Sequence, residues 1–81
     1  MTHNYTASVK YFDFLVGNPR AWQLIFPIST TIVKNDTINV IEVDVFGVPT
    51  GNSMTGTVIF PVTNDNWTYR DKDRLVYVSP D

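Results

Sequence analysis

The stretch Ile38–Phe46, with the sequence INVIEVDVF, is the clearest indicator of the fold. Alternate positions in its second half are apolar, and they are Ile41, Val43 and Val45. Glu42 and Asp44 occupy the positions between them, which point to the opposite face of an extended strand. The alternation predicts a strand with one buried side and one partly solvent-exposed side, and therefore a sheet with one solvated face.

The residues that follow have the order of an antiparallel hairpin. Gly47–Asn52 is rich in Gly and Pro and is predicted to form a turn, after which Met54–Val62 resumes a β-rich run. Asn64–Asn66 ends that run, and Leu75–Val78 is predicted to form a last short strand.

The N-terminal part adds two strands and a helix. Apolar and polar residues alternate over Tyr5–Tyr11, which predicts a half-buried strand. Tyr11–Val16 is apolar on every side and is predicted to form one or two buried helical turns that stop at Gly17. Trp22–Phe26 is rich in aromatic and β-branched residues and is predicted to form a strand that ends at Pro27.

The length of the chain fits one domain over residues 1–81. It holds six Lys plus Arg, eight Asp plus Glu and no Cys among its 81 residues, with a formal net charge of −2. Five or six short strands are expected to curl into a barrel, because closure removes exposed strand edges. The predicted fold is a mostly-β domain, a small curled β-barrel of five or six strands with one short helix.

Composition excludes several classes of site. Without Cys the chain can form no disulfide or thiolate metal site, and its single histidine, His3, is near a terminus that we expect to be frayed. The acids match no calcium loop and the four glycines match no phosphate-binding spacing, so we expect no metal and no cofactor. We also expect no signal peptide, no membrane span and a cytoplasmic location.

Acidic residues give weak evidence for catalysis. Glu42 and Asp44 share a predicted strand face about 6–7 Å apart, which a carboxylate pair would require. Two solvated acids on the outer face of a sheet are the favoured interpretation. We therefore predict that the protein is not an enzyme.

Nucleic-acid binding has more support from the basic and aromatic residues. Three of the six basic residues alternate with acids near the C-terminus, and they are Arg70, Lys72 and Arg74. The aromatic residues that could stack on an unpaired base are Trp22, Trp67 and Tyr69, and these lie near Arg20 and Arg70 in sequence. The alternative is that both Trp residues belong to the core.

The order of signals over Lys10–Val62, about two thirds of the chain, resembles the ASCH-like branch of the PUA superfamily, and in particular its small phage-borne members. Lys10–Gly17 looks like the family's strand end and Tyr-Phe helix closed by Gly. Trp22–Ile25 stands where the family has a Glu-x-Arg strand. Val33–Asp44 is similar to the family's Val-Gly-Asp turn and the acidic strand after it. Thr50–Gly51 is similar to its Thr-Gly element, and Thr55–Phe60 is similar to the strand that follows that element.

Several positions depart from the family's pattern. Gln23 replaces its Glu, Ile25 its Arg and Asn35 its Gly, and the segment Asn18–Arg20 replaces a Lys. Because apolar alternation is intact while polar positions have changed, the resemblance implies the barrel more directly than a ligand site. A matching Lys, Thr and Glu set for the amidohydrolase activity of some ASCH-type proteins is not present.

The resulting prediction is a small non-enzymatic, phage-encoded module that binds RNA or single-stranded nucleic acid between helix and barrel. The expected site residues are Arg20, Trp22, Gln23, Lys34 and Arg70, with the cations on phosphate and Trp22 as a stacking face. The alternative is an acidic module that binds or inhibits a host protein. Its unprotected strand edge could also pair two copies as a homodimer.

Overall fold

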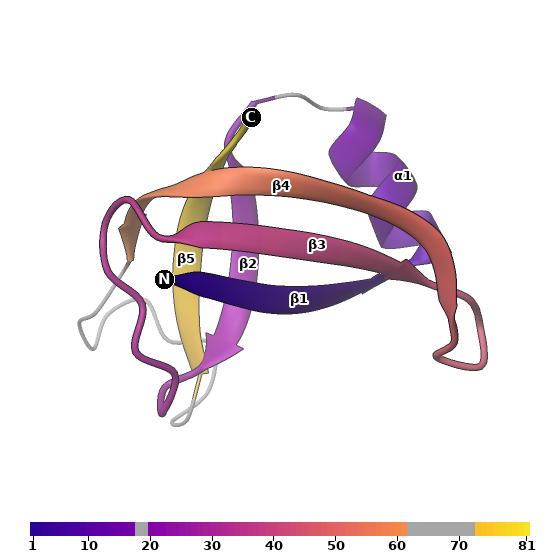
Figure 1. Ribbon diagram of the computed structural model, residues 1–81, viewed down its shortest axis with the longest axis horizontal. Coiled ribbons are helices and arrows are strands. Elements are labelled where there is room, and N and C mark those ends of the chain that lie inside the picture. The colour runs from indigo at the N-terminus through magenta and orange to yellow at the C-terminus, as the bar shows by residue number, and fades with distance from the viewer. Residues whose placement is uncertain (18–19, 62–72) are drawn as a thin grey trace.

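The computed structural model describes residues 1–17, 20–61 and 73–81 (Figure 1). In chain order these residues form β1 (Thr2–Ser8), α1 (Val9–Gly17), β2 (Trp22–Pro27), β3 (Thr37–Val43), β4 (Pro49–Pro61) and β5 (Asp73–Pro80). The strands make one five-stranded sheet in the order β1-β3-β4-β5-β2. The prediction of a mostly-β domain with one helix is confirmed.

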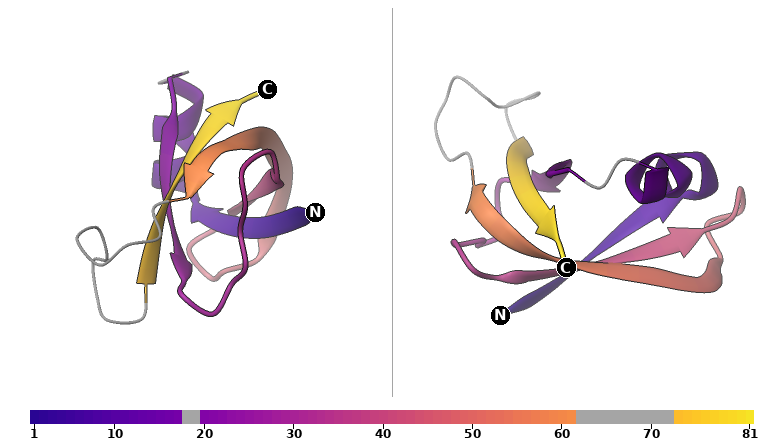
Figure 2. Two further views of the ribbon diagram at one scale, coloured as in Figure 1. Left: turned by 90° about the vertical axis from the view of Figure 1, so that its left-hand side faces the viewer. Right: turned by 90° about the horizontal axis from the view of Figure 1, so that it is seen from above.

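The sheet folds over on itself. β1 runs parallel to β3, and the other neighbouring strands are antiparallel. Figures 1 and 2 show β1, β3 and β4 in one layer, with β2 and β5 crossing behind them. The strand order leaves β1 and β2 at the two ends of the sheet, and the described residues include no backbone pairing between these two strands.

β4 joins the two layers. Its first part pairs with β3 and its last part with β5, and the register shifts between Val58 and Phe60. At the crossing, a Cβ on Gly56 would lie 2.5 Å from Val78 Cγ1 and 2.8 Å from the Ser79 carbonyl oxygen. Glycine therefore allows this close approach of β4 to β5.

The core lies between the layers. In β2 the residues alternate strictly, with Trp22, Leu24 and Phe26 buried and the residues between them exposed. The other layer and the helix supply the opposing side chains, which include Ala7, Phe12, Leu15, Ile38 and Val40. The burial of β2 thus has the period of two of an extended strand, although Ile25 on its outward side is apolar.

The N-terminal strand differs from the prediction. β1 begins at Thr2 and pairs along its length with β3, so the terminus near His3 is held in the sheet and the expectation that it is frayed was wrong. The strand ends at Ser8, whose hydroxyl oxygen accepts a hydrogen bond from the Tyr11 N–H at 3.5 Å, as helix N-cap residues do. α1 consequently starts before the predicted Tyr11 and includes the whole predicted helix.

The predicted facing of the central strand was also wrong. Ile38, Val40 and Glu42 are buried, whereas Ile41 and Val43 are only partly buried. The error arose from Val45, which lies beyond the end of β3 and does not share its faces. Without Val45, each side of the strand has two apolar residues, Ile38 and Val40 on one side and Ile41 and Val43 on the other. Tertiary packing therefore decides which of the two sides faces the core.

The hairpin that follows is confirmed, but its turn is earlier than predicted. β3 and β4 pair as antiparallel neighbours, and β4 begins at Pro49, inside the predicted turn Gly47–Asn52. The predicted strands Trp22–Phe26 and Leu75–Val78 lie within β2 and β5. The predicted break at Asn64–Asn66 lies outside the described residues.

Candidate functional site

A pocket of ≈ 420 Å³ lies between α1 and β2. Tyr11 and Phe14 line it from the helix, and Leu75 lines it from β5. The start of β2 supplies the remaining residues, which are Ala21, Trp22, Gln23 and Ile25. This is the place where the sequence predicted a groove between the helix and the sheet.

The helical wall follows from the pattern of α1. Phe12 and Leu15 are buried in the core, and the preceding positions Tyr11 and Phe14, three residues apart, share a neighbouring face on which Tyr11 packs against the edge of the core and Phe14 is exposed. The two rings stack with centroids 6.2 Å apart and planes 15° apart. Phe14 is 59% exposed, so an aromatic face at the pocket is accessible to a ligand.

The β2 wall is the outward side of an edge strand. Gln23 and Ile25 alternate with the buried residues of β2 and therefore project away from the core. The Tyr11 hydroxyl donates a hydrogen bond to the Gln23 backbone oxygen at 2.8 Å. That bond joins the two walls and satisfies a carbonyl on the strand edge that does not pair with β5.

Tyr5 of β1 extends the contact between the two ends of the sheet. Its ring lies 5.2 Å from the ring of Phe26 and 6.4 Å from that of Tyr11, measured between centroids. Burial raises the pKa of Tyr5, and interactions with the Ile25 backbone and the Tyr11 hydroxyl oppose that rise. Two tyrosines thus bridge β1 and α1 to the edge of β2 through side chains.

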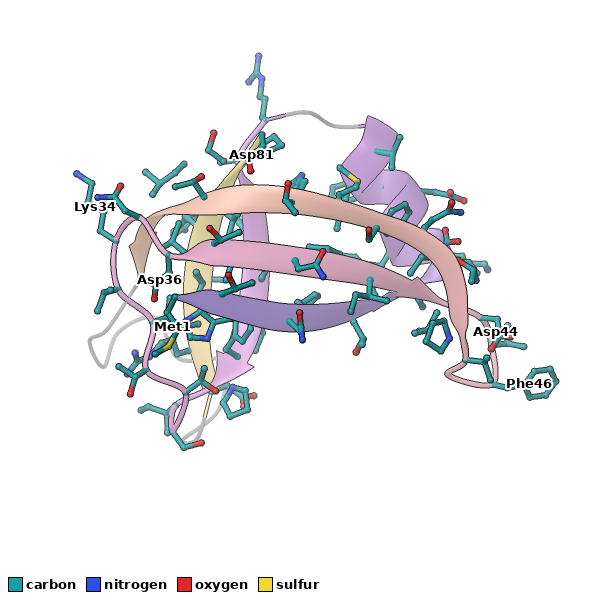
Figure 3. All side chains as sticks on the ribbon, in the orientation of Figure 1. Met1, Lys34, Asp36, Asp44, Phe46 and Asp81 are labelled. Atoms are coloured by element: carbon teal, nitrogen blue, oxygen red, sulfur yellow. The ribbon has the colours of Figure 1, made fainter. Side chains whose placement is uncertain are left out.

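The structure brings together only part of the predicted site. Trp22 and Gln23 line the pocket, and the exposed Arg20 directly precedes the lining residue Ala21. Lys34 is exposed at the opposite end of the molecule from α1 (Figure 3). Arg70 lies outside the described residues, as do Trp67 and Tyr69.

Trp22 does not have the predicted role of a stacking face. It is only 3% exposed, and its six-membered ring packs toward Gly56, so the indole belongs to the core. Its Nε1 is buried without a hydrogen-bond partner. The alternative interpretation of Trp22 as a core residue is the correct one.

Sequence analysis missed the residues that supply the accessible aromatic surface. Tyr11 and Phe14 were assigned to a helix buried on every side, although their spacing of three matches one face of a helix. Lys10 was also missed, and it is exposed one helical turn before Phe14. Lys10 and Arg20 each adjoin a lining residue in sequence, Tyr11 on the helical wall and Ala21 on the β2 wall.

A separate polar cluster surrounds Asp36 at the start of β3. One carboxylate oxygen is 3.3 Å from the Met1 amino group, and the other is 3.0 Å from His3 Nε2 and accepts the Val33 N–H at 2.9 Å. The Val33 N–H first, and then His3, hold the pKa of Asp36 below its ordinary value, while burial opposes them. Because these bonds tie the loop before β3 to β1, the cluster stabilises the sheet.

Glu42 and Asp44 accept hydrogen bonds from different parts of the β3–β4 hairpin. Glu42 is buried, contrary to the favoured interpretation as a solvated acid, and it accepts hydrogen bonds from the Thr50 hydroxyl and the Asn52 amide. Asp44 follows β3 and accepts the N–H groups of Phe46 and Val48. Each carboxylate organises its own part of the β3–β4 hairpin.

Searches for similar proteins returned no match to a protein family or to a curated protein. No helix in the described part of the chain is long and apolar enough to cross a membrane. Within the same residues, no three His, Asp or Glu side chains gather in a group that could hold a metal ion.

Proposed function

We propose that this protein is a small non-enzymatic module that binds an unpaired nucleotide of RNA or single-stranded nucleic acid in the pocket between α1 and β2. The observation that carries the proposal is an exposed aromatic side chain, Phe14, in a pocket with a cation next to each wall. Single-stranded nucleic acids are bound by stacking of bases on aromatic rings and by cations on the phosphates.

Each part of a nucleotide has a matching group in this arrangement. A base would stack on Phe14, and the exposed Gln23 amide has both a donor and an acceptor for the edge of a base. Lys10 and Arg20 would contact the flanking phosphates. The net charge of −2 favours recognition of a single unpaired site over general affinity for duplexes.

The same proposal includes membership of the ASCH-like branch of the PUA superfamily, a closed barrel and a phage origin, all of which the resemblance implies. Its support is the position of the pocket, because the helix and strand that wall it are two of the segments that carry the resemblance, Lys10–Gly17 and Trp22–Ile25. The contacts of Tyr5 with Phe26 and Tyr11 support closure, since they connect the two end strands through side chains.

Titration with a short fluorescent RNA at low and high salt tests the proposal, with two matched pairs of variants. We expect F14A to weaken binding about 5-fold to 100-fold through lost stacking, while F46A, which removes an exposed aromatic side chain of the β3–β4 turn, does not weaken it. The slope of log affinity against log salt concentration is negative, and we expect R20Q to reduce its magnitude by about 0.7. K34Q should leave that slope unchanged. Absence of binding at micromolar protein in low salt would contradict the proposal.

A module that binds another protein is the second candidate, and the β3–β4 turn favours it. Val45, Phe46 and Val48 are all exposed there, which is unusual for a turn in a small domain. Titration with RNA separates the two candidates, because Phe46 lies outside the pocket that the nucleotide would occupy.

A further inference from the structure

The turn between β3 and β4 presents three apolar side chains to solvent, and we name this set the apolar tip: Val45, Phe46 and Val48. Phe46 is 86% exposed, the highest fraction for any aromatic residue in the described part of the chain. Figure 3 shows it pointing away from the sheet beyond the end of the hairpin. An aromatic side chain held in this way resembles the anchors that fill pockets in protein interfaces.

The tip is held in one conformation by Asp44. The carboxylate oxygen Oδ1 accepts the N–H of Phe46 at 2.8 Å and that of Val48 at 2.9 Å. Backbone hydrogen bonds from Asp44 N–H to the Val48 oxygen and from Gly47 N–H to the Asp44 oxygen complete the turn. A rigid tip loses little conformational entropy on binding, which favours association.

The same chain contains a pocket that complements the tip. The pocket between α1 and β2 is lined by apolar and aromatic side chains, and its ≈ 420 Å³ can accommodate a phenyl ring. Figures 1 and 2 both place α1 and the β3–β4 turn at the same end of the molecule. Because both features share one end, two copies related by a two-fold axis could exchange them.

Charge also favours this pairing. Asp44 lies beside the tip, and the sequence contains no Lys or Arg between residues 35 and 69. Lys10 and Arg20 adjoin residues that line the pocket, as does the acid Asp13, so Asp44 of one copy would meet two cations and one acid of the other. An anionic membrane surface attracts basic segments, and the tip residues Val45, Phe46 and Val48 have no Lys or Arg beside them in sequence, which favours a protein over lipid as the occupant.

We propose that the protein self-associates by insertion of Phe46 of each copy into the α1–β2 pocket of a second copy. The contact is reciprocal and buries both apolar tips. If the pocket also binds a nucleotide, a consequence that rests on the proposed function, then self-association and nucleic-acid binding exclude one another.

Sedimentation equilibrium of the protein without nucleic acid, from micromolar concentrations to about 1 mM, tests the contact. We expect the mean mass to rise from 9.2 kDa toward twice that value, and F46S to remain at 9.2 kDa throughout. V33S is the matched control, because it removes an exposed apolar side chain outside the tip and the pocket and should dimerise as the wild type does. A wild type that stays monomeric, or an F46S that dimerises equally, would overturn the proposal.

A mixing experiment tests whether the tip and the pocket contact each other. F14A alters the pocket wall and F46S the tip, so each alone should be monomeric, whereas an equimolar mixture keeps one intact contact per pair. We expect measurable association in the mixture, weaker than in the wild type. No association in the mixture would contradict reciprocal insertion, and binding of monomeric wild type, but not F46S, to anionic vesicles would assign the tip to lipid instead.

Discussion

Asp36 acts at the scale of a single residue to hold the start of β3 against β1. Its carboxylate contacts the Met1 amino group, His3 and the Val33 N–H. Sequence patterns did not identify this role, because the partners are up to 35 positions away along the chain. An acid in a turn has the same local signature whether it is solvated or buried.

The pH dependence of stability should reflect Asp36. The pKa of this carboxyl is lower in the folded protein than its ordinary value of about 3.9, so the unfolded chain binds more protons near that pH. The stabilisation is therefore fully present above about pH 4 and is lost as pH falls through the lower folded pKa.

D36N should unfold at lower urea concentration than the wild type near pH 7, and the difference between the two proteins should shrink below about pH 4. Urea midpoints measured across this pH range give the result. D13N, which changes an exposed acid of α1, is the control and should show no such difference. A gap between D36N and the wild type that is constant with pH would contradict the assignment.

The Tyr11 hydroxyl is the second residue with a specific role, because it joins α1 to the edge of β2 through the Gln23 oxygen. Replacing Tyr11 in Y11F keeps the ring and removes this bond together with the hydroxyl interaction with Tyr5, so we expect a loss of about 0.5–1.5 kcal/mol or more in the free energy of unfolding. Chemical denaturation measures the loss. An unchanged stability in Y11F would contradict a stabilising role for the hydroxyl.

At the scale of the element, sequence patterns predicted the helix and most strands because each depends on local periodicity. β2 matched almost residue for residue, since its buried and exposed positions alternate without exception. The sequence did not show which side of β3 faces the core, because Val40 and Ile41 are adjacent apolar residues on opposite sides of the strand. The antiparallel β3–β4 pairing was predicted, whereas the parallel pairing of β1 with β3 was not, because nothing local to Thr2–Ser8 indicates a parallel partner.

The crossing of β4 over β5 depends on Gly56, and a glycine pair tests it. In G56A the new methyl group would collide with Val78 and with the Ser79 backbone, so we expect a loss of about 1–3 kcal/mol in stability. In G17A the methyl group meets nothing within 4 Å, and we expect a neutral effect or a gain of about 0.4–1 kcal/mol. Thermal or urea unfolding compares the two variants, and equal stability would contradict the close approach at Gly56.

The sequence could predict only those parts of the candidate site that depend on the position of a residue within its own helix or strand. Gln23 lines the pocket because it lies on the outward side of β2, a strand that the sequence predicts. The packing of Trp22 into the core and the distance of Lys34 from α1 follow from how the sheet folds over, which no local pattern contains. The same is true of the accessible face of Phe14, which depends on where the helix packs.

At the scale of the whole molecule, one small core between two layers supports the fold. A domain of 81 residues has a stability of about 4–12 kcal/mol, so one large cavity removes a substantial part of it. L24A empties a fully buried position of β2 and should cost about 2–5 kcal/mol.

I25A is the control for that prediction, because Ile25 is the next residue along β2 and projects to the partly exposed side. We expect its loss to be about 1 kcal/mol, as is common for single substitutions outside the core. Urea unfolding of both variants gives the comparison. Equal losses in the two variants would contradict the two-layer core, because the burial of β2 would then not alternate.

The parallel pairing of β1 with β3 has a consequence for synthesis on the ribosome. Thr2 is aligned with Thr37, so the first strand to emerge has no sheet partner until about 35 further residues have been translated and released from the exit tunnel. During that interval its edges are open to chaperones or to other nascent chains. The polar outer side of this strand, with Thr2, Asn4, Thr6 and Ser8 all exposed, would limit such encounters by keeping the waiting segment hydrated.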